Sequence, residues 1–181
     1  MNNMIKSILC AFVAFISFQT NAQDNYKLEA DYMNCMCSLF EDNGAEFKSL
    51  IKKAEQKLLS TELLTNTNGE SYIALYKNIQ LAIDGRISNF GISDYVIKRL
   101  LDTKNTKKYS KCMDGILKSS DFKDSKLSKF IAMSSSGNNP EITDLTSKML
   151  EIFEVKDFNH EFYKYLTFSL IDKYHASNKK E

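Results

Sequence analysis

The sequence predicts an all-α fold, a compact bundle of about seven or eight helices stapled by one disulfide. Three observations predict it. Apolar residues recur at spacings of three and four along most of the chain, as on one face of an amphipathic helix. No segment shows the strict alternation of a half-buried strand. Proline occurs once, at Pro140, so few positions forbid a helix.

The N-terminal segment has the layout of a secretory signal peptide. Lys6 precedes an apolar run over 8–18, and small residues lead to Ala22. The run is shorter than the about 20 apolar residues that cross a bilayer, although a retained N-terminal anchor is the alternative. A lipoprotein signal does not fit, because Cys10 lies inside the apolar run. We therefore expect cleavage after Ala22 and export to the periplasm or the extracellular space.

After cleavage, residues 23–181 have the length of a single helical domain without a transmembrane segment. The formal net charge of the whole chain is +1, and it falls to zero when Lys6 is removed. No basic excess indicates a nucleic acid or an anionic membrane as a partner.

The cysteines organise the chain. An exported protein enters an oxidising compartment, so Cys35, Cys37 and Cys112 are expected to form one disulfide and leave one thiol. On a helix, residues two apart point about 200° away from each other. Cys35 shares an apolar face with Leu28 and other residues, and Cys112 also lies on an apolar stripe, which favours a Cys35–Cys112 bridge. Such a bridge closes a long loop and is worth about 4 kcal/mol.

Three alternatives for the cysteines stay open. Cys37 is either an inert buried thiol or a redox-active group of a Cys35-Met36-Cys37 motif. A bond to another chain is the third possibility, and the partner of Cys112 is not decided between Cys35 and Cys37. A bond between Cys35 and Cys37 would close a strained ring that exchanges easily.

The first half of the domain contains four expected helices. They cover about 24–41, 45–59, 70–83 and 93–101. Asp42, Asn43 and Gly44 separate the first two, and the polar turn 65–69 separates the next two. Ser93 is the expected N-cap of the fourth helix, and 87–91 is a short extended connection.

The second half begins with a basic connection over 104–108, which we interpret as a solvated linker. A helix around Cys112 follows and ends near 117, and another covers about 122–133. The segment 134–140 is rich in Ser, Asn and Gly and is expected to be a loop. Pro140 then opens a helix with an apolar stripe to Phe153.

The last expected helix begins near Phe158, with Asp157 or Asn159 as its cap, and runs past Leu170. It is apolar over most of its circumference, so we expect it to lie at the centre of the bundle or to be covered by a partner. Its aromatic residues are interpreted as core. The tail 176–181 is charged and is expected to fray.

The sequence contains no catalytic or phosphate-binding motif, and it suggests no catalytic residue, cofactor or metal site. The two histidines, His160 and His175, are expected at the surface on different faces of the last helix. His160 and Glu161, with Asp157, lack the paired His or Cys spacing of metal ligands. A nucleophilic site would need Cys37 or Cys112 to lie near His160.

Acidic residues recur at spacings of three and four near the C-terminus, at Glu151, Glu154, Asp157 and Glu161. Lysines alternate with them, which is typical of a solvated, salt-bridged face. We therefore interpret these carboxylates as a surface ridge and not as a general acid and base.

Three stretches resemble exported helical proteins of flavobacteria and their relatives, a family without an established activity. They are the end of the signal at Asn21-Ala22-Gln23, the segment 68–76, and the segment 157–171. The resemblance covers most of the mature chain and includes no catalytic residue. It implies a location in the cell envelope and no mechanism.

Two functional hypotheses follow. The first is a non-catalytic envelope protein that acts as a protein-interaction or binding module with an unidentified protein partner, of which an immunity-type inhibitor of a secreted toxin is a special case. The second is a thiol–disulfide protein that uses Cys35 and Cys37. Replacement of Cys37 by Ser separates them, because a loss of function is expected only for the second.

Overall fold

The computed structural model describes residues 26–86, 89–134 and 140–178, and all statements below concern these residues. The all-α prediction is confirmed, because the described residues form helices without any strand. The helices are α2 (Lys27–Cys37), α3 (Ala45–Ser60), α4 (Gly69–Lys77), α5 (Ile92–Leu100), α6 (Thr103–Leu117), α7 (Lys126–Ser134), α8 (Ile142–Ile152) and α9 (Glu161–Asn178). A π-helical turn, η1 (Ala82–Arg86), precedes α5, and a 3₁₀ turn, η2 (Val155–Asn159), precedes α9.

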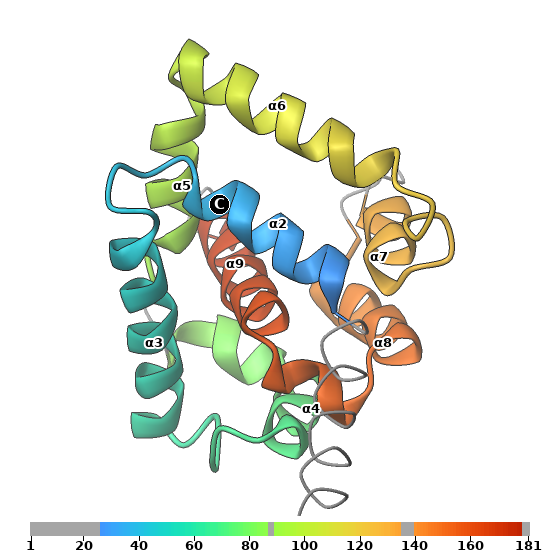
Figure 1. The fold of residues 1–181 in the computed structure, drawn as a ribbon. Coiled ribbons are helices and arrows are strands. Elements are labelled where there is room, and N and C mark those ends of the chain that lie inside the picture. The colour runs from blue at the N-terminus through green and yellow to red at the C-terminus, as the bar shows by residue number, and fades with distance from the viewer. Residues whose placement is uncertain (1–25, 87–88, 135–139, 179–181) are drawn as a thin grey trace, which may run out of the picture.

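Helix α9 lies at the centre of the bundle, as its composition predicts. Figure 1 shows α2, α3 and α5 arranged around it, with α4 below and α7 and α8 on one side. Its rings of Phe162, Tyr163 and Phe168 are fully or almost fully buried. Aromatic stacking between Tyr72 of α4 and Phe158 of η2 continues the same core. The prediction that these aromatics are core residues is confirmed.

Helix α6 lies along α2 at the edge of the bundle (Figure 1). The predicted bridge joins the two helices, with Cys35 and Cys112 bonded and their Cα atoms 5.8 Å apart. Ile116 is the buried apolar residue of α6, while Tyr109 and Met113 are partly buried against the core. Because α6 contributes little to the core, the disulfide is a main attachment of this helix.

The expected linker 104–108 is wrong, since these residues form the first turns of α6. The Asp102 carboxylate accepts hydrogen bonds from the backbone N–H groups of Lys104 and Asn105, at 2.8 and 3.1 Å. This is an N-cap, which satisfies donors that a helix start leaves without partners. The lysines of this turn are exposed, so their charge is compatible with a helix.

Three other expected boundaries differ from the structure. The first helix ends at Cys37, and 38–41 form turns. The helix expected from 70 to 83 ends at Lys77 and is followed by η1, and the helix expected from 122 begins at Lys126. Ser125 ends the preceding turn, and its hydroxyl accepts from the N–H of Ser128 at 3.0 Å.

Helix α5 is capped by a residue that is distant in the sequence. Ser93 is inside the helix, which begins at Ile92 after Gly91, so its expected role as N-cap is wrong. The carboxylate of Asp172 in α9 accepts hydrogen bonds from the N–H groups of Phe90 and Ser93. A side chain of the central helix therefore fixes the start of α5.

The packing of α4 against η2 leaves no room for a side chain at Gly69. A Cβ atom at this position would lie 1.8 Å from the carbonyl oxygen of Val155, which no rearrangement of a side chain relieves. The N-terminus of α4 and the start of η2 are thus in close backbone contact. This contact holds η2 against α4 at the edge of the site described below.

Several sequence predictions lie outside the described residues or partly so. They are the signal peptide 1–22 and its cleavage site, part of the connection 87–91, the loop residues 135–139, and the end of the tail at 179–181. Among the helices that are described, none is both long enough and apolar enough to cross a membrane.

Candidate functional site

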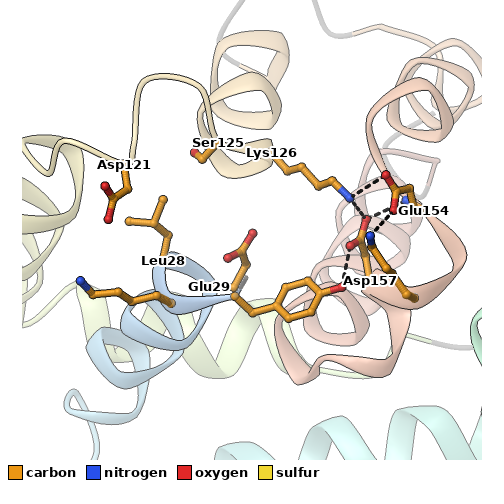
Figure 2. A pocket seen from close by; sticks show the side chains of 10 residues that line it. Leu28, Glu29, Asp121, Ser125, Lys126, Glu154 and Asp157 are labelled. Carbon is orange, nitrogen blue, oxygen red and sulfur yellow. Dashed lines mark hydrogen bonds and ion pairs between the residues drawn. The ribbon is translucent and has the colours of Figure 1, made fainter. Parts of the chain in front are cut away.

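A cavity of about 360 Å³ lies between the start of α2, the start of α7 and the turn η2 (Figure 2). Two of its carboxylates are buried, those of Glu29 and Asp157, with 4% and 0% of their surfaces exposed. Its lining consists of Tyr26, Lys27, Leu28, Glu29, Asp121, Ser125, Lys126, Glu154, Lys156 and Asp157. Two nearly dehydrated acids in one cavity require compensation by hydrogen bonds or cations.

Hydrogen bonds to both carboxylate oxygens of Asp157 compensate for its burial. Its Oδ1 accepts a hydrogen bond from the hydroxyl of Tyr26 at 2.9 Å. Its Oδ2 accepts from Nζ of Lys126 and from the N–H of Glu154, both at 2.7 Å. Burial, together with the Asp157 carboxylate, raises the pKa of Tyr26 above its ordinary value, so the phenol stays a donor.

Lys126 joins the two acids at this side of the cavity. Its Nζ lies 2.7 Å from Asp157 and 3.6 Å from the carboxylate of Glu154. Glu154 also pairs with Lys156 at 2.8 Å. Figure 2 shows Lys126 extending from the start of α7 to Glu154 and Asp157. These ion pairs neutralise the η2 side of the cavity.

Glu29 is in a different situation. The hydroxyl of Tyr163 donates to its Oε1 at 2.7 Å, and this contact is buried. Within the described part of the chain, no lysine, arginine or histidine forms an ion pair with Glu29. Figure 2 shows its carboxylate directed from α2 toward the space beside Ser125 and Lys126. Among the described residues, the Glu29 carboxylate therefore lies at this cavity without an ion pair.

A second cavity of about 350 Å³ is lined by both cysteines of the disulfide. The two share Lys27, Leu28 and Asp121. The second is also lined by Asp31, Asn34, Cys35, Cys112, Gly115, Ile116 and Ser119. A Cβ at Gly115 would meet no atom within 4 Å, so there is open space at this position of α6.

The predicted acidic ridge is only partly correct. Glu151 and Glu154 are exposed, but Asp157 is completely buried and belongs to the cavity. Asp157 also does not cap the last helix, which begins at Glu161. It forms a capping box with Glu154 at η2 instead. The spacing of three and four in the sequence cannot predict the burial of Asp157, because the 3₁₀ turn η2 interrupts the α-helical periodicity between α8 and α9.

Neither histidine has the expected position on the surface. His175 is buried, with Nε2 at 3.1 Å from the carbonyl oxygen of Ala82. His160 is half-buried, stacks on Tyr26 with ring centroids 5.2 Å apart, and accepts a hydrogen bond through Nδ1 from the N–H of Phe162 at 3.2 Å. His160 thus caps the start of α9, a role expected for Asp157 or Asn159.

The stability of the protein should depend on the charge of His160. Burial lowers the pKa of His160, while Glu29 and Glu161 partly oppose this shift. A lowered folded-state pKa means that the unfolded chain binds the proton more tightly, so stability falls as the pH decreases from about 6.5. Protonated Nδ1 also cannot accept from Phe162. We expect a lower urea midpoint at pH 5 than at pH 7.5.

The control is His160→Asn, since an asparagine oxygen caps a helix start at every pH in this range. This variant should lose much of the difference between the two urea midpoints. An unchanged difference in His160→Asn would show that another group is responsible.

Cys37 is buried beside the turn that precedes α3. A Cβ at Gly44, whose φ is +82°, would lie 2.6 Å from the Cys37 sulfur. Burial raises the pKa of Cys37, Glu161 and Asp42 add to this, and Lys48 opposes it. A buried thiol with a raised pKa is a poor nucleophile.

We therefore expect the native protein to resist alkylation by iodoacetamide at pH 8. Denaturation without reduction should expose one thiol per chain, and peptide mapping should place the label on Cys37. Reduction should then release Cys35 and Cys112, which the structure shows to be bonded. Rapid labelling of the native protein would contradict the burial of Cys37.

Sequence reasoning did not find the central residues of this cavity. Glu29 resembles an ordinary acidic residue in the first turn of a helix, and Lys126 an ordinary solvated lysine. Their partners lie in other elements, such as Tyr163 for Glu29, 134 positions away. The described residues contain no group of three or more His, Cys, Asp or Glu side chains arranged to hold a metal ion.

Searches of known protein-family models, curated proteins and solved structures find no match to this chain. The resemblance of its sequence to exported helical proteins of flavobacteria stays a prediction.

Proposed function

We propose that the chain is an exported, non-catalytic binding protein of the cell envelope, and that its ligand site consists of the two neighbouring cavities beside α2. The observation that carries this proposal is the pairing of Asp157. Both of its oxygens are occupied by Tyr26, Lys126 and a backbone N–H. A general base needs a free oxygen that reaches the substrate, whereas a preformed polar wall serves binding.

The location rests on two supports. The segment 1–22 has the layout of a signal peptide. The Cys35–Cys112 bridge is typical of an oxidising compartment. A processed protein beginning at Gln23, found by intact mass in the envelope or culture fraction, is the expected result. An unprocessed cytosolic chain with four reduced thiols would contradict this location.

Ligand binding is tested by introducing a bulky side chain with Asp121→Trp, because Asp121 lines both cavities and is exposed. Asp114→Trp is the matched control, an exposed position of α6 outside both linings. Each purified protein is incubated with an envelope extract, and retained small molecules are identified by mass spectrometry after native gel filtration. The wild type and the control should retain a molecule that Asp121→Trp does not. Equal retention, or none, would overturn the proposal.

A second candidate function is the docking of a protein partner, which exposed apolar residues favour. Ile97 and Leu101 lie one turn apart at the end of α5 and are 52% and 77% exposed. A photo-crosslinker at Leu101 should capture a partner in the envelope, and Ile97→Ser should weaken the capture. Leu81→Ser, at another exposed apolar position, is the control. Capture that does not change with Ile97→Ser would contradict docking at this end of α5.

The thiol–disulfide alternative has less support. Cys35 is bonded to Cys112 and not to Cys37, so the strained ring is absent from the described structure. Cys37 itself is buried with a raised pKa, whereas reactive thiols are exposed and have a lowered pKa.

A further inference from the structure

We propose that the corner between the end of α5 and the start of α6 binds an anionic phospholipid bilayer, with Leu101 among the acyl chains and lysines at the headgroups. This surface goes beyond the proposed ligand site, because none of its residues lines either cavity beside α2. Two independent properties support it, an exposed apolar pair and a concentration of positive charge. Figure 1 shows the corner at the outer end of the bundle.

The apolar part of the corner consists of Ile97 and Leu101. They lie one turn apart at the end of α5 and are 52% and 77% exposed. A different side of this helix packs into the core through the buried Ile92 and Val96. Both exposed side chains gain free energy when they leave water, and the interfacial region of a bilayer provides such an environment.

Positive charge is concentrated in the same stretch of the chain. Residues 97–111 contain six basic side chains and one acidic side chain, so their net charge is +5. The whole chain has a formal net charge of +1, so the remaining residues together have −4. The near-zero charge of the mature chain, from which the sequence predicts no anionic partner, therefore conceals an uneven distribution. The six basic residues are Lys98, Arg99, Lys104, Lys107, Lys108 and Lys111.

Helix α6 gathers four of these lysines on one exposed face, because they recur at spacings of three and four. With a rise of 1.5 Å per residue, they extend over about 10 Å of the helix. Lys108 donates to the carbonyl oxygen of Ser38. Among the described residues, Lys104, Lys107 and Lys111 form no ion pair. Their ammonium groups are therefore available to the phosphates of lipid headgroups.

Hydrogen bonds fix the two parts of the corner to each other. The side-chain amide of Asn105 donates to the carbonyl oxygen of Arg99 at 3.1 Å, and the hydroxyl of Thr106 donates to that of Leu100. Leu101 is therefore held next to the first turns of α6 and their lysines. An apolar tip beside several cations is the combination that binds the interface of an anionic bilayer. A projecting corner enters a fluid bilayer without the large complementary surface that a protein partner needs.

The experiment is cosedimentation of the exported, oxidised protein with lipid vesicles at low salt. Vesicles of equal parts phosphatidylcholine and phosphatidylglycerol should bind the protein, and added salt should weaken this binding. Vesicles of phosphatidylcholine alone should not bind it. No binding to the anionic vesicles, or equal binding to both kinds, would overturn the proposal.

Charge-removing variants locate the binding surface. Lys104→Gln with Lys107→Gln should weaken binding to the anionic vesicles about tenfold to thirtyfold, since each lysine near such a surface contributes about fivefold. Lys129→Gln with Lys148→Gln removes the same charge at exposed positions of α7 and α8 and should have much less effect. Equal weakening by the two pairs would show that the corner is not the binding surface.

Insertion of residue 101 is tested by fluorescence, because the chain contains no tryptophan. The emission of Leu101→Trp should shift to shorter wavelengths on the anionic vesicles and should be quenched by brominated acyl chains. Leu81→Trp, at another exposed apolar position, is the control and should show neither change. Leu101→Ser should bind the vesicles about tenfold more weakly, because an apolar contact is lost. Unchanged binding of Leu101→Ser, or equal quenching at both positions, would contradict insertion at the corner.

Failure of the membrane surface is distinguishable from failure of the proposed function. Retention of a small molecule at the cavities is measured without vesicles, so either result is obtained independently of the other. If the anionic vesicles do not bind while the photo-crosslinker at Leu101 captures a protein, the corner is a protein interface and the membrane proposal is wrong.

Discussion

Replacement of Asp157 by Ala should lower the free energy of unfolding by about 3 kcal/mol. The substitution removes a completely buried acceptor from three donors. The hydroxyl of Tyr26 and the N–H of Glu154 lose an acceptor, and Lys126, whose side chain is 29% exposed, keeps its charge without this partner. Unfolding in urea, followed by circular dichroism, measures the change at constant slope.

A double-mutant cycle identifies the cause of this loss. If the unpaired Lys126 contributes much of it, Asp157→Ala combined with Lys126→Ala should cost less than the sum of the two single variants. Glu151→Ala belongs to the same periodic acidic pattern but is exposed, so it should change stability by less than about 0.5 kcal/mol. Equal effects of Asp157→Ala and Glu151→Ala would mean that the buried network does not form.

Removal of the disulfide by Cys35→Ala with Cys112→Ala should cost about 2 to 5 kcal/mol. The bond links positions 77 residues apart and attaches α6 to α2, while α6 itself buries few apolar residues. Hydrogen exchange should therefore increase first in Thr103–Leu117 and much less in α9, whose aromatic face is in the core.

Cys37→Ala is the control for loss of a buried sulfur without loss of the bridge. We expect it to cost about 1 kcal/mol and to leave the exchange of α6 unchanged. If exchange rises uniformly in the bridge variant, α6 is held by packing and the disulfide only stabilises the whole domain.

The two largest predictions also bear on the site. Asp157 holds Lys126 and Tyr26 on one wall of the first cavity, and the disulfide forms part of the wall of the second. Both variants are therefore expected to weaken binding through loss of structure. Loss of binding in either variant therefore does not identify the ligand.

Local patterns in the sequence account for most of the helices and favour the observed bridge. The apolar spacing of three and four predicts α3 and α8, because one turn of helix relates such residues directly. The apolar circumference of α9 leaves a central position or a covering partner, and the structure shows the central position. The opposed directions of Cys35 and Cys37 on one helix favour Cys35 as the partner of Cys112, and the structure decides for it. These inferences depend on geometry within a single element.

The tertiary structure alone decided the starts of α5 and α9, the burial of Asp157 and His175, and the cavity itself. Asp172 caps α5 from 79 positions away, and Tyr163 reaches Glu29 across 134 positions. Electrostatic and hydrogen-bond partners of this kind are set by how helices pack, and helical periodicity carries no information about them. The sequence by itself thus determined most of the helical segments and their apolar faces, whereas only the packing of the helices decided which charges are buried and paired.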